Sequence, residues 1–93
     1  MAKLTPEEAQ SRLEALSGWT LDGDTLRKTF VQSSFPGVIA FVTHVGFLAE
    51  AANHHPDLDI RYNKLTVALS THDAGGLTEK DFDLAAQMDE LMI

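Results

Sequence analysis

The sequence has 93 residues and no cysteine, so it predicts one small domain spanning residues 1–93, without disulfides or a Cys-ligated metal. Fourteen acidic against seven basic residues give a net charge of −7, which disfavours nucleic acid and anionic membranes as partners because both select for basic patches. The N-terminus shows no apolar signal core, and no stretch approaches the roughly 20 apolar residues of a membrane span. We therefore expect a cytoplasmic protein with no membrane partner.

The first predicted helix begins after Thr5. Pro6 occupies the first helical position, and Glu8 stands three residues after the capping threonine, which is the pattern of a capping box. Gly18 is the predicted end of this helix, since glycine commonly follows a helix C-terminus.

Residues 19–31 predict a β-hairpin. Asp22-Gly23 is the expected two-residue turn, and it would place Trp19 opposite Leu26. Lys28 interrupts the alternation of apolar and polar residues along the second strand.

A long helix is predicted from the Ser33–Gly37 break to about Asn53, and Pro56 excludes its continuation. Its apolar residues form a wide arc: Phe35, Val38, Ile39, Val42, Val45, Ala49 and Ala52. Phe41 and Leu48 extend this arc, and Phe47 lies further round, on the other side of the helix. One small domain cannot cover all these directions, so we expect this surface, with Phe41 and Leu48 in it, to contact a second copy of the chain.

Residues 58–62 and 65–70 alternate as two strands of a second hairpin, with Asn63-Lys64 as the expected turn. That register pairs Ile60 with Val67 on an apolar face. On the other face it pairs Asp57 with Ser70 and His55 with His72. Because facing residues on one side of a hairpin stand about 5 Å apart at Cβ, the two histidines are expected to converge.

Gly75-Gly76 breaks the chain before a last helix, which Thr78 caps with Asp81 three residues later. The expected apolar face of this helix is Leu84, Ala85, Met88, Leu91 and Met92. The order α-ββ-α-ββ-α predicts an α+β two-layer sandwich, with a four-stranded antiparallel sheet and helices packed on one face.

The end of the long helix is the candidate functional site. Glu50, Asn53 and His54 share one direction around the helix axis, and the chain then enters His55, the expected neighbour of His72. A helix C-terminus and a nearby Glu50 carboxylate both favour a charged imidazole, so His54 suits the role of a general acid.

Simpler interpretations exist for each residue. The His54–Pro56 segment is also a common helix-ending loop, Glu50 a solvated charge, and Asp81 a helix cap. Tyr62 beside a turn suggests packing, and His44 a surface or interface histidine. The convergence of independent helix and strand geometry favours a catalytic site over these separate explanations.

Two other kinds of site fit the sequence less well. Three histidines and a carboxylate can bind zinc, but adjacent His54 and His55 usually diverge, and no HExxH or His-x-His spacing occurs. A Ser-His-Asp hydrolase is disfavoured because there is no GxSxG motif and Ser70 has no strand-to-helix elbow. We expect no metal.

The segments Glu50–Pro56, Tyr62, Ser70–Asp73 and Gly76–Asp81, together with Leu16–Trp19, resemble the pterin-4a-carbinolamine dehydratase family over nearly the whole chain. Asn53 and Leu58 depart from the aspartate and tryptophan of animal members. The resemblance implies a homodimer or homotetramer that needs no cofactor. Animal members of the family also act as dimerisation cofactors of a homeodomain transcription factor. A protein-binding module is therefore the alternative function.

The resemblance also implies a reaction and residue roles. The substrate is a 4a-hydroxytetrahydropterin, which loses water to give the quinonoid dihydropterin recycled for aromatic amino acid hydroxylases. His54 and His72 form the acid–base pair, His55 mainly holds the pterin, and Glu50 and Asp81 support them. The residues implied in substrate binding are His55, Asn53, Asp57, Ser70, Thr71 and Asp81.

Overall fold

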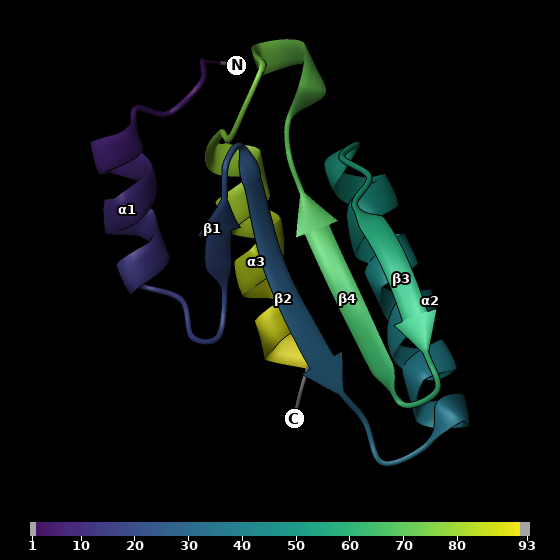
Figure 1. Ribbon diagram of the computed structural model, residues 1–93. Helices are drawn as coiled ribbons and strands as arrows, with labels where there is room; N and C mark the ends of the chain where they lie inside the picture. The colour runs from purple at the N-terminus through teal and green to yellow at the C-terminus, as the bar shows by residue number, and fades with distance from the viewer. Residues whose placement is uncertain (1, 92–93) are drawn as a thin grey trace.

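The computed structural model describes residues 2–91, so Met92, expected on the last helix, lies outside the described residues. The elements in chain order are α1 (Pro6–Glu14), β1 (Thr20–Asp22), β2 (Thr25–Val31), α2 (Phe35–Ala52), β3 (Asp57–Arg61), β4 (Lys64–Leu69), the 3-10 turn η1 (His72–Ala74) and α3 (Glu79–Leu91). The four strands form one antiparallel sheet in the order β1-β2-β4-β3. Helices α2 and α3 lie behind the sheet in Figure 1, and α1 lies beside β1. The predicted α+β two-layer sandwich is confirmed.

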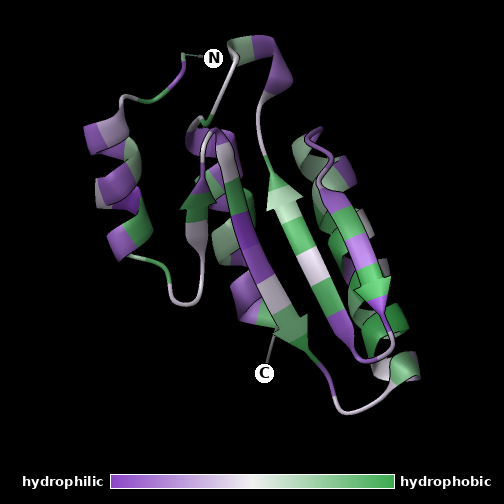
Figure 2. Ribbon diagram, viewed as in Figure 1, coloured by the Kyte–Doolittle hydropathy of each residue, from purple (hydrophilic) through white to green (hydrophobic). Residues whose placement is uncertain are grey.

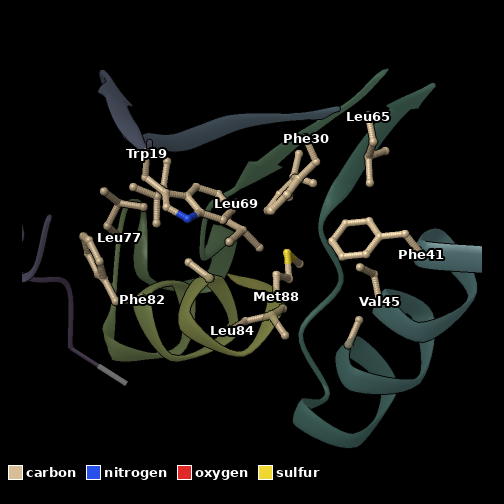
Figure 3. Packing of buried hydrophobic residues seen from close by; sticks show 14 of the residues in the cluster. Trp19, Phe30, Phe41, Val45, Leu65, Leu69, Leu77, Phe82, Leu84 and Met88 are labelled. Atoms are coloured by element: carbon tan, nitrogen blue, oxygen red, sulfur yellow. The ribbon is translucent and has the colours of Figure 1, made fainter. Parts of the chain in front are cut away.

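The core fills the space between the sheet and the two long helices. Alternate residues of β2 and β4 point into it, which gives these strands the banded hydropathy seen in Figure 2. Trp19 packs edge-on against Phe30, with ring centroids 5.8 Å apart, and Phe30 packs against Phe41 at 4.9 Å. Figure 3 shows these rings bridging the α3 and α2 sides of the core.

Lys28 interrupts the alternation of β2 because its side chain lies on the core side of the sheet. Its Nζ sits 4.7 Å from the Phe30 ring centroid and donates to Asp89 at 2.7 Å and to the Ser17 carbonyl at 2.9 Å. Asp89 also accepts from the Trp19 indole N–H. The apolar stem of the lysine therefore covers aromatic surface while its charge is paired.

The helix boundaries follow their caps. Thr5 and Glu8 form the predicted capping box, which confirms the start of α1. The helix ends at Glu14 with Ala15 as its C-cap, so the predicted end at Gly18 is wrong. Gly18 instead takes a left-handed φ of 84° in the connection to β1. Asn53, at φ 50°, ends α2 as a left-handed cap, which asparagine tolerates better than most residues.

Both hairpins are shifted from their predicted registers. Leu26 pairs with Leu21, whereas the prediction paired it with Trp19. The first loop is Gly23-Asp24, one residue later than predicted, because Gly23 takes the left-handed φ of 61° that opens the turn.

In the second hairpin Ile60 pairs with Leu65, so the loop is Tyr62-Asn63 and the predicted register is wrong by two residues. Tyr62 takes the left-handed conformation at φ 52°. Asn63 is held by contacts outside the turn as well: its side chain donates to the Gln32 carbonyl at 3.1 Å, and its carbonyl accepts from the Gln32 N–H at 2.9 Å. A shift of two residues leaves every side chain on its predicted face.

Helix α2 carries more exposed apolar surface than the other elements. Phe41 is buried in the core, so its predicted place at an interface is wrong. Leu48 is half-buried against the core, and its contact with a second copy stays a prediction. The exposed large residues of α2 are Phe35, Ile39 and Phe47. By length and mean hydropathy (1.5) α2 could also cross a membrane, contrary to our reading of the sequence, although the core helix of a globular domain passes the same test.

Candidate functional site

The site lies at one end of the sandwich, where α2 ends, β4 ends and α3 begins (Figure 1). A cleft of about 300 Å³ opens there, which is at the lower end of the size range of small-molecule sites. Its lining residues are Asn53, His54, His55, Ser70, Thr71, His72, Asp73 and Lys80. Six of the predicted site residues are therefore brought together.

His54 is the buried member of the site. The left-handed turn at Asn53 ends the helix, and the His54 backbone N–H donates back to the Ala49 carbonyl at 3.0 Å. This turn directs the imidazole inward, where Nε2 lies 2.5 Å from the Asp81 Oδ1. Asp81 is fully buried, so it lies behind His54 and does not line the cleft. Its position fits support of His54 and does not fit direct contact with a substrate.

Hydrogen bonds from three directions hold Asp81. Besides His54, its carboxylate accepts from the Thr78 backbone N–H at 2.9 Å and from the Thr71 hydroxyl at 2.8 Å. Thr78 is also the cap of α3, so Asp81 is the predicted capping residue and a partner of His54 at once.

The direction of each hydrogen bond follows from proton counting. A carboxylate only accepts, so the Thr71 hydroxyl must donate its one hydrogen to Asp81. Thr71 therefore accepts from the Thr78 hydroxyl, 2.8 Å away, and the Thr78 hydroxyl in turn accepts from the Lys80 N–H at 3.3 Å. His54 must donate through Nε2–H. Its other nitrogen, Nδ1, is the one left for a molecule in the cleft.

Thr71 is thus committed to Asp81 although it lines the cleft. Its only hydrogen points away from any bound molecule, and one lone pair is occupied by Thr78. The Thr71 hydroxyl therefore cannot donate a hydrogen bond to a substrate. Of the substrate-binding role implied for Thr71, its side chain can only accept a hydrogen bond.

His55 and Glu50 form a second, exposed pair. The His55 Nε2 lies 2.9 Å from the Glu50 Oε1, and both side chains are mostly in solvent. The prediction placed Glu50 beside His54, and this is wrong: Asp81 holds His54, and Glu50 holds His55. Glu50 itself does not line the cleft.

His72 reaches the cleft from a tight turn. It begins η1, which Gly75 closes at φ 75° by donating its N–H to the His72 carbonyl at 3.0 Å. Thr71 and Gly76 exchange two backbone hydrogen bonds across the base of this turn. With the observed register continued past β3, His55 comes opposite Ser70 and not opposite His72, yet both histidines line the same cleft.

Three further placements complete the site. Asp57 lines a smaller adjoining cavity and not the main cleft. Asp73 and Lys80 line the cleft but were not predicted as site residues. Asp73 directly follows the predicted site residue His72, and this position in the sequence could have indicated that it lines the cleft. Lys80 lies within the predicted cap of the last helix, and nothing in the sequence indicates that it lines the cleft.

Residues 2–91 contain no group of three or more His, Asp or Glu side chains placed to hold a metal ion. Two histidine–carboxylate pairs are present at the site, Asp81 with His54 and Glu50 with His55.

Comparison with known proteins gives consistent results. A family model described as pterin 4 alpha carbinolamine dehydratase matches residues 2–91. A protein of Roseiflexus sp. (strain RS-1), provisionally named pterin-4-alpha-carbinolamine dehydratase, is 61% identical over 97% of both chains. A relative from Chloroflexus aurantiacus with the same provisional name is 56% identical over 99% of both chains.

Solved structures share the fold. A transcriptional coactivator/pterin dehydratase from Brucella melitensis is 33% identical, with a TM-score of 0.92 over 96% of this chain and 97% of its own. A pterin dehydratase-like protein described as a RuBisCO assembly factor of the alpha-carboxysome has a TM-score of 0.69 over 81% of this chain and 89% of its own, and at 24% identity it shows the fold alone. Since the family model and these relatives span almost every described residue, the chain belongs to the pterin-4-alpha-carbinolamine dehydratase family.

Proposed function

We propose that this protein dehydrates a 4a-hydroxytetrahydropterin by histidine acid–base catalysis. The observation that carries the proposal is the arrangement of the cleft. The buried carboxylate of Asp81 holds His54 through Nε2, and His72 lines the same cleft from the turn that follows β4. Family membership makes a pterin the expected ligand.

The reaction needs two proton transfers, which two histidines can supply. The C4a–O bond breaks as the hydroxyl accepts a proton and leaves as water. N5 gives up its proton, and its electron pair forms the C4a=N5 double bond of the quinonoid dihydropterin. Acid and base exchange their states during turnover, and a positioned group of this kind typically contributes 10²- to 10⁴-fold each.

His54 and His72 are assigned these transfers, with His54 acting through Nδ1. His55 holds the pterin, and Glu50 fixes the ring of His55. Asp81 keeps His54 in one tautomer and one orientation, as a carboxylate does for the imidazole of a catalytic triad. The product would feed pterin recycling for aromatic amino acid hydroxylases.

The test is turnover of a freshly generated 4a-hydroxytetrahydropterin, followed by the absorbance of the quinonoid product. We expect the wild type to accelerate dehydration well above the buffer rate, and to do so equally after exhaustive chelation. His44→Ala is the control for substitutions of the cleft histidines and should keep the wild-type rate, because His44 is an exposed histidine of α2 outside the cleft. Acceleration absent from the wild type would contradict the proposal. Activity lost together with bound zinc would contradict the metal-free mechanism.

A protein-binding role is the second candidate, since the Brucella structure is also described as a coactivator and the more distant one as an assembly factor. No contact among the described residues favours that role over catalysis. The same turnover assay separates the two, because a binding module has no need of an acid–base pair.

A further inference from the structure

The segment before α1 lies against the chain that connects η1 with α3, at the end of the sheet where the site lies (Figure 1). The Leu4 backbone N–H donates to the Leu77 carbonyl at 2.8 Å. The Leu4 side chain packs against the core, and Leu77 is buried in it. This contact joins two parts of the chain that are far apart in sequence. We call residues 2–4 the N-terminal strap.

Lys3 adds a second, weaker contact to the N-terminal strap. Its stem lies over Gly76, where a methyl group on the glycine would come within 2.7 Å of the lysine Cε. Its ammonium pairs with Asp24 at 3.7 Å, but both side chains are more than half exposed, and an exposed pair of this kind contributes little. The backbone hydrogen bond of Leu4 is therefore the main contact between the strap and the loop.

The Leu77 carbonyl belongs to the same peptide group as the Thr78 N–H. This group is planar and trans, so its C=O and N–H point in opposite directions. The carbonyl accepts from Leu4, and the N–H donates to the buried carboxylate of Asp81 at 2.9 Å. The Leu77–Thr78 peptide is thus held at both ends. Rotating it away from Leu4 would also turn its N–H away from Asp81.

Asp81 connects this peptide with the imidazole of His54. Its Oδ2 accepts from Thr78 and Thr71, and its Oδ1 lies 2.5 Å from the His54 Nε2. Hydrogen bonds in series also polarise one another in the low-dielectric interior of a protein. A change at Leu4 therefore reaches the imidazole through one peptide group and one carboxylate.

Building on the proposed function, we infer that the Leu4 backbone N–H is a positioning group for His54. It fixes the Leu77–Thr78 peptide, and this peptide keeps Asp81 in place behind the imidazole. The N-terminal strap does not line the cleft. Loss of the hydrogen bond should therefore slow proton transfer at His54 and leave pterin binding nearly unchanged.

Leu4→Pro tests this inference, because proline has no N–H to donate. We expect kcat to fall about fivefold, the effect of one hydrogen bond, with KM changed by less than about twofold. In the NMR spectrum the Thr78 amide proton should move upfield as its bond to Asp81 lengthens. The ¹⁵N signals of the His54 ring should show Nε2–H less uniformly populated.

An ester in place of the Lys3–Leu4 peptide removes the same hydrogen and keeps every side chain, so it should give the same changes without altered packing. It can be made by incorporating the α-hydroxy analogue of leucine at position 4. This variant also answers the case in which proline prevents folding.

Leu4→Ala and Ala2→Pro are the matched controls, because both keep the Leu4 N–H. Leu4→Ala loses apolar contact with the core, so it should lower Tm while kcat and both NMR signals stay as in the wild type. Ala2→Pro places the same residue in the strap and should leave all readouts unchanged.

A wild-type kcat or an unmoved Thr78 signal in the ester variant would overturn the inference. An equal fall of kcat in Leu4→Ala would overturn it as well, since lost stability would then account for the effect. A wild type without turnover would sink the proposed reaction, and the Thr78 and His54 signals would still decide whether Leu4 positions His54.

Discussion

His54 and His72 line one cleft but differ in burial, so replacing them should have different effects on stability. His54 is buried against Asp81, whereas His72 stands exposed at the start of η1. We predict that His54→Ala and His72→Ala each lower the dehydration rate at least tenfold, since each removes a proton-transfer group. His54→Ala should also destabilise the fold by about 1–3 kcal/mol, because a buried carboxylate loses a donor.

Denaturant unfolding and turnover measured side by side check this pair. His72→Ala should keep wild-type stability. His55→Ala should mainly raise KM, in keeping with a role in holding the pterin. A wild-type rate in either His54→Ala or His72→Ala would remove that histidine from the mechanism.

A second prediction concerns the hydroxyl hydrogen that Thr71 donates to Asp81. In Thr71→Val the shape is kept but the hydroxyl that donates to Asp81 is lost, so the hold on the His54 tautomer weakens. We expect kcat to fall about tenfold with little change in KM, and the ¹⁵N spectrum to show Nε2–H less uniformly populated on His54. Thr71→Ser should restore both readouts. A KM effect alone would mean that Thr71 acts on the substrate and not through Asp81.

The partners of the histidines illustrate the limit of sequence reasoning at this scale. The helical periodicity placed Glu50 beside His54, because the helix was assumed to run on through it. The left-handed residue Asn53 breaks that periodicity, and His54 swings toward Asp81 instead. The convergence of residues on one spot could be predicted, because it depends only on where α2 and β4 end. The pairing could not, because it depends on one φ angle.

At the scale of elements, the capping box of α1 gives a pH-dependent prediction. The pKa of Glu8 is lowered, mainly because the Thr5 backbone N–H donates to its carboxylate, with the Thr5 side chain and the Arg12 charge acting in the same direction. A carboxylate with a lowered pKa in the folded state contributes stability fully above its ordinary pKa, and loses it as the pH falls through the lowered value.

Glu8→Ala should therefore lower Tm by a few degrees near pH 7, and by less near pH 3. Glu8→Gln is the matched control, since glutamine keeps the acceptor and loses the charge. It should fall between the wild type and Glu8→Ala at pH 7. The same Tm difference for Glu8→Ala at both pH values would show that the charge is irrelevant.

The elements themselves were largely predictable, and the two hairpins show which part was not. Alternation fixes which face a residue takes, so the apolar sides of β2 and β4 agree with the sequence pattern. The exact partner depends on the turn, and tertiary contacts decide the turn. The bonds between Asn63 and Gln32, which join the second hairpin to the β2–α2 connection, had no local signal.

At the scale of the whole molecule, self-association remains a prediction that rests on the exposed side of α2 and no longer on Phe41. Phe47 is 72% exposed in the C-terminal half of α2, and Ile39, also exposed, lies about two turns earlier and about 80° round the helix axis. Burying one such side chain is worth roughly 1.5–3 kcal/mol, and a symmetric assembly repeats the contact. Phe47→Asp should lower the mass found by light scattering while leaving the fold intact.

Phe41→Asp, in contrast, should unfold the chain, because Phe41 packs inside the core against Phe30. Gln10→Asp on the exposed surface of α1 is the control for added charge and should leave the mass unchanged. A wild type that stays monomeric at micromolar concentration would refute the interface on α2.

The strand order has a consequence for how the chain reaches this structure. Each hairpin joins neighbours in sequence, but β2 pairs with β4 only after the whole of α2 and β3 has intervened. Hairpins close within about 1–10 μs, whereas pairing across a long intervening segment carries a larger loss of chain entropy. We therefore predict that the junction of β2 with β4 is the slow step in refolding. Substitutions there, and in the Gly23 and Tyr62 turns that close before it, should therefore change the folding rate more than the unfolding rate.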